Sequence, residues 1–548
     1  MVHLIKKKIK GKIYLYLQET ARIDGKSKRI WQRYIGPEEK IRKMTKIHLN
    51  PDFTIKHLDF GLPASLLDIA TQLELVKIID DCVPKRNQGL SIGHYILFAA
   101  FNRCIKPTSK TQMRHWFENT IFAKKFPKID TYFDAKAYSN HFHYLTPSII
   151  EDIETRIHQK LIKEFNVDMS LLFYDPTNFF TYINPKESQM LPRHGHSKEN
   201  RSTLNLVGLA LFCTNDGGIP LLHDVYPGNV QDARLFRNEI LKLKKRLKKL
   251  NQDPRDLCLV FDKGNLSDTI FSEIDGMKVN FVASIRPSTQ KDLHNLTAQD
   301  FTLEKLPNLK KVGVLEYKRE LYGKTRRLIV VYNPKRSKWQ GNNLICKLNK
   351  KIEEVNDFFA QRLNVKKWRN SEAIKLKIDT IIKTKQYFQW INYFVSGSEG
   401  KISYSISLNQ SALQSHLATL GKSFIFSNHP KLSAIDLVWL YRQQYTVERA
   451  FKYIKSPNLI QIRPMFHRND DSVRGHLFVC VIGLLLLTLL ARKVNRQFPE
   501  FSLPTIVNIL SEIGISLIKF SGSSKIIRKL DKFSADAAKL CDYLGLNA

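Results

Sequence analysis

Cysteine is scarce in this sequence, and its few cysteines are not arranged in pairs. The 548 residues contain seven, an odd number, and none belongs to a Cys-x-x-Cys motif. They are Cys82, Cys104, Cys213, Cys258, Cys346, Cys480 and Cys541. This pattern predicts neither a disulfide framework nor a thiolate zinc site, and it is typical of a protein in a reducing cytosol.

Long hydrophobic runs are also lacking. The longest covers residues 477–491, whereas a membrane span needs roughly 20 apolar residues. The N-terminal sequence MVHLIKKKIKGK has no apolar segment after its charges, so no secretory signal is expected. We therefore predict a buried core helix at 477–491 and a cytoplasmic protein that has no membrane partner.

Acidic residues are outnumbered by basic ones. The sequence has 51 Asp and Glu against 87 Lys and Arg, a formal net charge of +36. So large a surplus favours a polyanionic partner such as nucleic acid, although a ribosome-associated protein or a lysine-rich coding bias would produce part of it. The length and the 43% hydrophobic content predict several domains with real cores.

The periodicity divides the chain into regions of different structure. Residues 12–36 read as a β-hairpin that turns at Asp24-Gly25. From 62 to 166 the apolar spacings of three and four predict helices. Four strand-like runs follow, MSLLFYD, STLNLVGLALFC, IPLLHDVY and DLCLVFD, then FVASIR. They predict an α/β layer with a central mixed sheet.

One helix is predicted among these strands, in DARLFRNEILKLKKRLKKL. Its apolar residues hold one face, and its other face carries basic side chains predicted to lie in solvent or against a DNA backbone. They are Lys242, Lys245, Arg246, Lys248 and Lys249.

Two aspartates each end one of the apolar runs. Asp175 closes MSLLFYD and Asp262 closes DLCLVFD. A carboxylate at the end of a buried strand lies at the edge of the sheet, where the active sites of open α/β sheets gather. Taken singly, Asp-Pro and Asp-x-Gly are also ordinary turn starters.

A helix is predicted over residues 441–455, YRQQYTVERAFKYIK. At about 100° per residue, one polar stripe roughly 60° wide carries Glu448 and Lys455, and a separate apolar face remains to be buried. Ser433, followed three residues later by Asp436, predicts a capping box at the helix start. By itself the segment also fits a surface helix with its Glu and Lys in solvent.

The spacing in this segment resembles the Tyr-x2-Arg-x3-Glu-x6-Lys signature of cut-and-paste insertion-sequence DDE transposases. The matching residues are Tyr441, Gln444, Glu448 and Lys455. The family's Arg is Gln444 here, and on a continuous helix Arg442 would point about 160° away from that position. The continuation resembles the long-chain subgroup at Ser456, Arg463, Pro464, His467, Gly475 and His476.

The resemblance implies an active site of three acids, Asp175, Asp262 and Glu448. Acids without thiols suit Mg²⁺ or Mn²⁺, and two such ions can drive in-line displacement at phosphorus. The implied activity is a DNA transposase that cleaves at mobile-element ends and transfers the strands into target DNA. The implied partners are the terminal inverted repeats, the target duplex and a second copy in a synaptic homodimer, in the cytoplasm at the nucleoid.

Further positions are predicted to contact DNA. Tyr441, Gln444 and Lys455 take this role from the signature. HGHSKENR, which resembles a loop of the same family, adds Lys198 and Arg201, for which solvated loop charges are the alternative. The spacings of His194, His196, His467 and His476 do not favour a zinc site.

The implied fold is a ribonuclease-H-like mixed sheet with helices, interrupted by a mostly β insertion domain and preceded by a β-hairpin and a helical domain. The expected boundaries are a basic hairpin module at 1–60, a helical domain for binding the DNA ends at 61–166, the catalytic domain at 167–290 and 423–495, the insertion at 291–422, and a tail at 496–548. Two alternatives remain: a catalytically silent DNA-binding relative, and a nuclease of the same fold that only hydrolyses.

Overall fold

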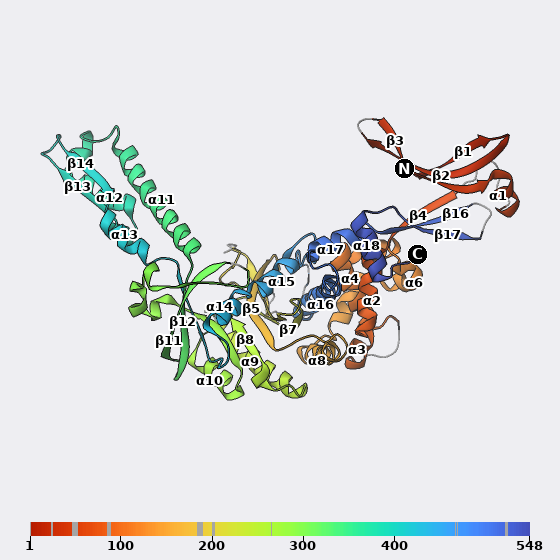
Figure 1. The fold of residues 1–548 in the computed structure, drawn as a ribbon, viewed down its shortest axis with the longest axis horizontal. Coiled ribbons are helices and arrows are strands. Elements are labelled where there is room, and N and C mark those ends of the chain that lie inside the picture. The colour runs from red at the N-terminus through yellow and green to blue at the C-terminus, as the bar shows by residue number, and fades with distance from the viewer. Residues whose placement is uncertain are drawn as a thin grey trace. The chain divides into compact units, whose positions relative to one another are not determined.

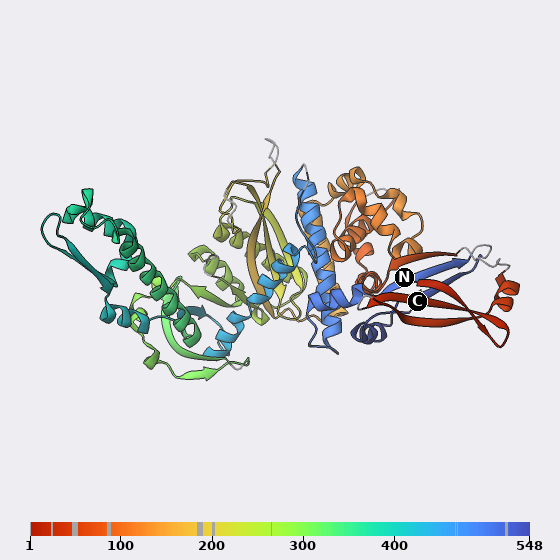
Figure 2. The ribbon, with the colours of Figure 1, turned by 90° about the horizontal axis from the view of Figure 1, so that it is seen from above.

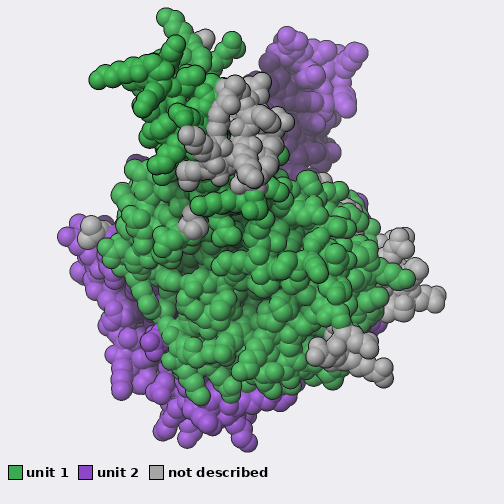
Figure 3. Space-filling model, turned by 90° about the vertical axis from the view of Figure 1, so that its right-hand side faces the viewer, with its two compact units in different colours: residues 1–165, 181–183, 452–548 green, residues 166–180, 184–451 purple. Residues whose placement is uncertain are grey.

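The computed structural model describes residues 2–23, 26–45, 53–84, 89–183, 190–199, 203–262, 264, 266–308, 310–465, 467, 469–520 and 524–547. The chain forms two compact units, coloured separately in Figure 3. Unit 1 comprises residues 1–165, 181–183 and 452–548, and unit 2 comprises residues 166–180 and 184–451.

Unit 1 contains two antiparallel sheets. The first is formed by β1 (Val2–Ile9), β2 (Lys12–Ile23) and β3 (Lys26–Pro37). The hairpin predicted over 12–36 is thereby confirmed, while its expected turn at Asp24-Gly25 lies outside the described residues. In the second sheet, β16 (Gly514–Phe520) pairs with both β4 (Phe53–Asp59) and β17 (Ile526–Leu530), so the predicted tail closes a sheet with an N-terminal strand.

The rest of unit 1 is helical, as predicted for 61–166. Its helices are α1 (Glu38–Thr45), α2 (Gly61–Gln72), α3 (Leu75–Cys82), α4 (Ile92–Ile105), α5 (Met113–Glu118), α6 (Phe122–Lys125), α7 (Ala135–Phe142), α8 (Pro147–Lys163), α16 (Asp470–Asn495), α17 (Leu503–Ser511) and α18 (Ala535–Leu544).

The long apolar helix α16 forms the core of unit 1. By length and composition it could cross a membrane, but 89% of its most apolar stretch is buried within the protein. It packs against α2, α4 and α7, which agrees with the core helix predicted at 477–491. The expected catalytic boundary at 495 differs from this structure, because residues 452–495 pack with the N-terminal helices instead.

Unit 2 is built on a nine-stranded sheet in the order β10-β11-β12-β15-β9-β8-β5-β6-β7. The strand β8 pairs in parallel with β5 and with β9. The pairs β6–β7, β9–β15, β15–β12, β12–β11 and β11–β10 are antiparallel. The mixed sheet predicted from the sequence is confirmed. The strands are β5 (Leu171–Thr181), β6 (Asn205–Thr214), β7 (Pro220–Pro227), β8 (Cys258–Phe261), β9 (Asn280–Ile285), β10 (Leu303–Lys305), β11 (Lys311–Leu321), β12 (Lys324–Tyr332) and β15 (Lys422–Ser427).

Two helices cover one face of this sheet through aromatic side chains. Phe236 of α9 (Asp232–Lys249) lies against Tyr174 of β5 and Phe261 of β8, with ring centroids 4.4 and 4.7 Å apart. Phe271 of α10 (Asp268–Met277) contacts Phe281 of β9. This layer fixes which face of each strand is available for chemistry.

The basic face predicted for α9 is wrong at one position. Arg246 is only 2% exposed, because it lies three residues after Leu243 and so falls on the buried side of the helix. Its neighbours Lys245, Lys248 and Lys249 are exposed, as predicted.

The expected insertion at 291–422 does not form one separate β domain. Its strands β10, β11 and β12 extend the central sheet, with β12 paired to β15. The physical reason lies in Leu328, Ile329 and Val330, which are all fully buried. A run without polar alternation needs both of its faces covered.

Only residues 334–418 form a subdomain of their own, called the helical insertion below. It contains α11 (Pro334–Phe359), α12 (Ser371–Ile382), α13 (Gln410–Ala418) and the hairpin of β13 (Ile391–Ser396) and β14 (Ser403–Leu408). Its own core includes Leu348, Val355, Ile374 and Ile378. Figures 1 and 2 show α11 leading away from the sheet, with β13 and β14 at its far end.

Candidate active site

Asp175 and Asp262 come from neighbouring parallel strands. Phe173 of β5 is level with Val260 of β8, and each aspartate follows its member of this pair by two residues. Because side chains alternate between faces along a strand, both carboxylates lie on the same face, opposite the aromatic layer under α9. The structure therefore brings these two predicted acids together at the carboxyl end of β8.

The position of Asp175 within its strand differs from the prediction. Asp262 follows the last residue of β8 as expected, but β5 continues beyond Asp175 to Thr181. β8 has only four residues, whereas β6, the neighbour on the other side of β5, has ten. Asp175 is therefore at the sheet edge because its neighbour β8 ends at Phe261, not because β5 ends there.

Two hydroxyl groups orient the carboxylate of Asp262. The Tyr441 hydroxyl donates to Oδ1 at 3.1 Å, and the Ser284 hydroxyl donates to the same oxygen. Ser284 is 8% exposed and sits on β9, whose residue Ala283 is level with Phe261. Sequence reasoning missed Ser284, since only the pairing of β8 with β9 places it beside Asp262.

Tyr441 also links Asp262 to Glu448 electrostatically. Burial raises the pKa of the Tyr441 phenol, and the charges of Asp262 and, more weakly, Glu448 raise it further, while a hydrogen bond with Ser284 acts in the opposite direction. The phenol therefore stays protonated at neutral pH and acts as a hydrogen-bond donor toward the acids.

Glu448 lies in the first turn of α15 (Tyr445–Lys455) and is exposed. Throughout the part of the chain that the structure describes, no group of three or more His, Cys, Asp or Glu side chains is placed to hold a metal ion. Two of the three predicted acids thus lie at the same sheet edge. Glu448 is related to them only by its charge, which contributes to the raised pKa of Tyr441. Their joint role as metal ligands stays a prediction.

The continuous helix predicted through 441–455 is wrong. The helix α14 (Ala434–Arg442) begins at the predicted Ser433–Asp436 capping box, but it ends before Gln443 and Gln444. Tight backbone bonds close the turn, from Gln444 N to Tyr441 O and from Thr446 N to Gln443 O. Gln444 is only 8% exposed, so it does not belong to an exposed polar stripe.

A cleft of about 690 Å³ opens on the α14 side of the sheet, called the Asp262 cleft below. Residues of β9, β12, β15, α11 and α14 line it, together with Asp262. Ser284, Tyr441 and Arg442 are among its lining residues. The acid that ends β8 is therefore reachable from this side.

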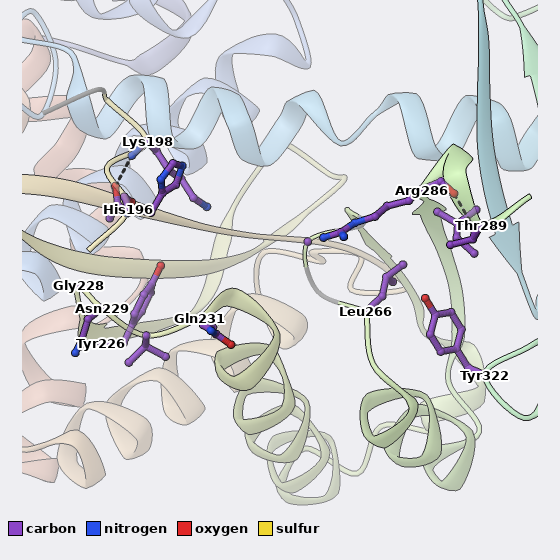
Figure 4. Close-up of a pocket in the computed structure, with 14 residues that line it drawn as sticks. His196, Lys198, Tyr226, Gly228, Asn229, Gln231, Leu266, Arg286, Thr289 and Tyr322 are labelled. Carbon is purple, nitrogen blue, oxygen red and sulfur yellow. Dashed lines mark hydrogen bonds between the residues drawn. The ribbon is translucent and has the colours of Figure 1, made fainter. Parts of the chain in front are cut away.

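A second cavity of about 630 Å³, the Lys198 pocket, lies at the carboxyl ends of β5, β7 and β9 (Figure 4). Lys198 and Arg286 enter it from opposite sides. The Lys198 ammonium donates to the Pro176 carbonyl at 2.6 Å, and the Asn178 amide donates to the His196 carbonyl at 2.8 Å. These bonds hold the 190–199 loop against β5, one and three residues beyond Asp175.

The remaining predicted contacts are more scattered. Arg201 lies outside the described residues. Lys455 is the last residue of α15 and belongs to unit 1. His476 is buried in α16 and contacts the Ile462 carbonyl through Nε2 at 2.8 Å, and burial lowers its pKa well below the usual value.

Comparisons with known proteins identify the family. The solved piggyBac transposase synaptic complex with hairpin DNA is similar to this chain at 8% identity and a TM-score of 0.36, covering 84% of this chain and 82% of that one. The Mos1 transposase paired-end complex with the left transposon end is similar at 11% identity and a TM-score of 0.16, covering 38% and 63%. No curated protein matches. Residues 185–486, more than half of the sequence, match the family described as "Transposase DDE domain", and the chain belongs to this family of DDE transposases.

Proposed function

We propose that this protein is a DNA transposase that cleaves DNA at the ends of a mobile element and joins the released strands to target DNA. The observation that supports the proposal is the pairing of the parallel strands β5 and β8, in which Asp175 and Asp262 each follow a paired residue by two positions. Asp262 lies within the matched residues 185–486, and Asp175 lies ten residues before them. Glu448, at the start of α15, is the third acid in this proposal.

The donor set fits divalent cations. Carboxylate oxygens are the ligands that Mg²⁺ and Mn²⁺ prefer, and Asp175, Asp262 and Glu448 would hold two such ions. When bound, the ions activate a water or a 3′-hydroxyl and stabilise the leaving oxygen. The protein's own part is orientation: Ser284 and Tyr441 hold Oδ1 of Asp262, which leaves Oδ2 free of these two donors.

DNA is the proposed substrate, bound in large part through its backbone. The net charge of +36 supports an affinity that falls steeply with salt. Lys198 beside Asp175, and Tyr441 and Lys455 flanking Glu448 in the sequence, are the proposed contacts near the reacting phosphate. Pairing of two element ends by a homodimer, and action at the nucleoid in the cytoplasm, complete the proposal.

End-labelled DNA that carries the inverted repeats flanking the reading frame tests this function. We expect Mg²⁺-dependent joining of the labelled strand to a target plasmid, and no joining with EDTA. Nicked product without joining would mean that the protein is a nuclease that only hydrolyses. A duplex that is bound yet unaltered would mean a catalytically silent DNA-binding protein.

A further inference from the structure

The charges around the Asp262 cleft are unbalanced. Among the described residues that line it, Asp262 is the only acidic one, against four basic ones. One of these, Lys422, is already engaged, since its ammonium donates to the carbonyls of His294 and Leu296. The other three are Lys310, Arg336 and Arg442.

These three side chains have no partner of their own. Among the described residues, none of them forms a side-chain hydrogen bond or an ion pair. Lys310 and Arg336 are exposed at the rim, where water solvates them, whereas Arg442 is half-buried. Burial lowers the pKa of Arg442, and no carboxylate acts against this effect.

Two arginines of the same sheet are neutralised by carboxylates within the protein. Arg326 is 1% exposed at its side chain and forms two hydrogen bonds with the carboxylate of Asp275, at 3.1 and 2.9 Å. Arg327 is similarly paired with Glu316. Because burying a charge without a counter-ion is costly, the lone guanidinium of Arg442 indicates a site for an anion that the protein itself does not supply.

Arg442 has this position because it shares one face of α14 with Val438 and Tyr441, which also line the cleft. On a continuous helix Arg442 would point away from the Gln444 position, but α14 ends at Arg442 and the chain turns at Gln443 and Gln444. Tyr441 and Arg442 both line the cleft that holds Asp262, whereas Gln444, beyond the end of α14, does not.

We propose that the Asp262 cleft binds a DNA phosphodiester adjacent to the reacting phosphodiester, and that the Arg442 guanidinium holds this adjacent phosphate. This inference rests on the proposed function and deepens it. The planar guanidinium fork of arginine matches two phosphate oxygens, and Arg336 and Lys310 at the rim attract the backbone toward it. Arg442 thereby supplies beside Asp262 the guanidinium that is missing at the Gln444 position.

Binding measurements without catalysis test this assignment. Fluorescence anisotropy of a labelled DNA duplex with a single-stranded tail is measured in EDTA over a range of salt concentrations, with the full chain and with Arg442→Gln. We expect the dissociation constant to rise about 10-fold or more, and the slope of log K against log salt to become shallower by about 0.9, as for one lost phosphate contact.

Two matched variants separate the role of Arg442 from net charge and from the signature position. Lys431→Gln removes the same charge from an exposed residue just before α14 that does not line the cleft, and its salt slope should stay close to wild type. Gln444→Ala should also keep the wild-type slope. Arg442→Lys should recover part of the affinity, because it restores the charge without the fork. Thermal unfolding of each variant checks that it is folded.

The possible results are distinguishable. A folded Arg442→Gln protein with an unchanged slope, or a loss of slope in Gln444→Ala alone, overturns the assignment. Competition by a free mononucleotide that Arg442→Gln abolishes, with DNA binding unaffected, also overturns it in favour of a small-molecule site. If Arg442→Gln loses one phosphate contact and the wild-type protein never cleaves DNA, the phosphate site is supported and the proposed function is contradicted.

Discussion

Removal of the Tyr441 hydroxyl should slow DNA cleavage far more than it weakens DNA binding. Tyr441→Phe keeps the ring in place and deletes only the O–H that donates to Oδ1 of Asp262 at 3.1 Å. Ser284 continues to donate to that oxygen. The carboxylate therefore keeps its charge and loses one of its two orienting donors.

The expected magnitude follows from the kind of bond that is lost. A hydrogen bond to a charged group contributes about 1.5–3 kcal/mol. If this energy holds Asp262 in its reactive orientation, the cleavage rate should fall about 10- to 150-fold, at roughly 1.4 kcal/mol per factor of ten. Ser284→Ala should have a similar effect, and the double variant should deviate from additivity because both donors share one acceptor atom.

The ratio of the wild-type cleavage rate to the Tyr441→Phe cleavage rate should not depend on pH. Since burial and the charge of Asp262 raise the pKa of Tyr441 above its usual 10.0, the phenol keeps its proton as the pH rises through that value. The hydrogen bond is present below the raised pKa and is lost only above it. Between about pH 6 and 9 the wild-type and Tyr441→Phe rates should therefore change in parallel.

Single-turnover cleavage of labelled element ends in Mg²⁺ measures this effect. Tyr445→Phe is the matched control, since Tyr445 is 50% exposed, lines the same cleft and has no side-chain hydrogen bond among the described residues. A Tyr441→Phe protein that cleaves at the wild-type rate would refute the orienting role. So would a loss of rate that follows a loss of DNA affinity.

Three further outcomes are expected. Asp262→Asn should abolish cleavage while sparing DNA binding, as measured by gel shift and product analysis, and retained cleavage would remove Asp262 from the site. Burial, and to a lesser extent the charge of Asp224, raises the pKa of Glu239 from 4.5 to about 8. These effects are larger than the opposite effect of the Lys242 ammonium, which lies 2.9 Å from the Glu239 carboxylate. The folded protein thus holds a proton that the unfolded chain releases, so the free energy of unfolding should fall between about pH 4.5 and 8. Glu239→Gln should flatten this fall in urea titrations at several pH values, and an unchanged pH dependence would exclude Glu239 as its source. Phe236→Ala, which deletes a fully buried ring between β5 and β8, should lower the free energy of unfolding by about 3–5 kcal/mol. Leu241→Ala, at a 39% exposed position of the same helix, is its control, and equal losses would contradict the packing described.

Local pattern accounts for the parts of the fold that could be predicted. The hairpin of β2 and β3, the capping box at Ser433 and the strand that ends before Asp262 each depend on neighbouring residues. Hydrophobic periodicity likewise marks α16 as a core helix. The two aspartates were candidates because each follows an apolar run, and the family resemblance distinguished them from ordinary turn starters.

Boundaries between domains were predicted less well, because a strand can pair with another strand that is far away along the chain. The strands β10, β11 and β12 resemble a separate β domain when only their own alternation is considered. Their buried residues are instead covered in the central sheet, next to β15. In the same way, β4 finds its partner in β16 near the other end of the sequence.

By itself, then, the sequence determined the elements, the acids at the sheet and the large positive charge, since each follows from residue type and local spacing. Only the tertiary structure decided which side chains meet. Tyr441 and Asp262 are 179 positions apart, and Ser284 reaches the same oxygen through the pairing of β8 with β9. Arg442, at the end of α14, lines the Asp262 cleft, whereas Gln444 in the following turn does not, because the direction of a side chain depends on where a helix ends and not only on its position in the sequence.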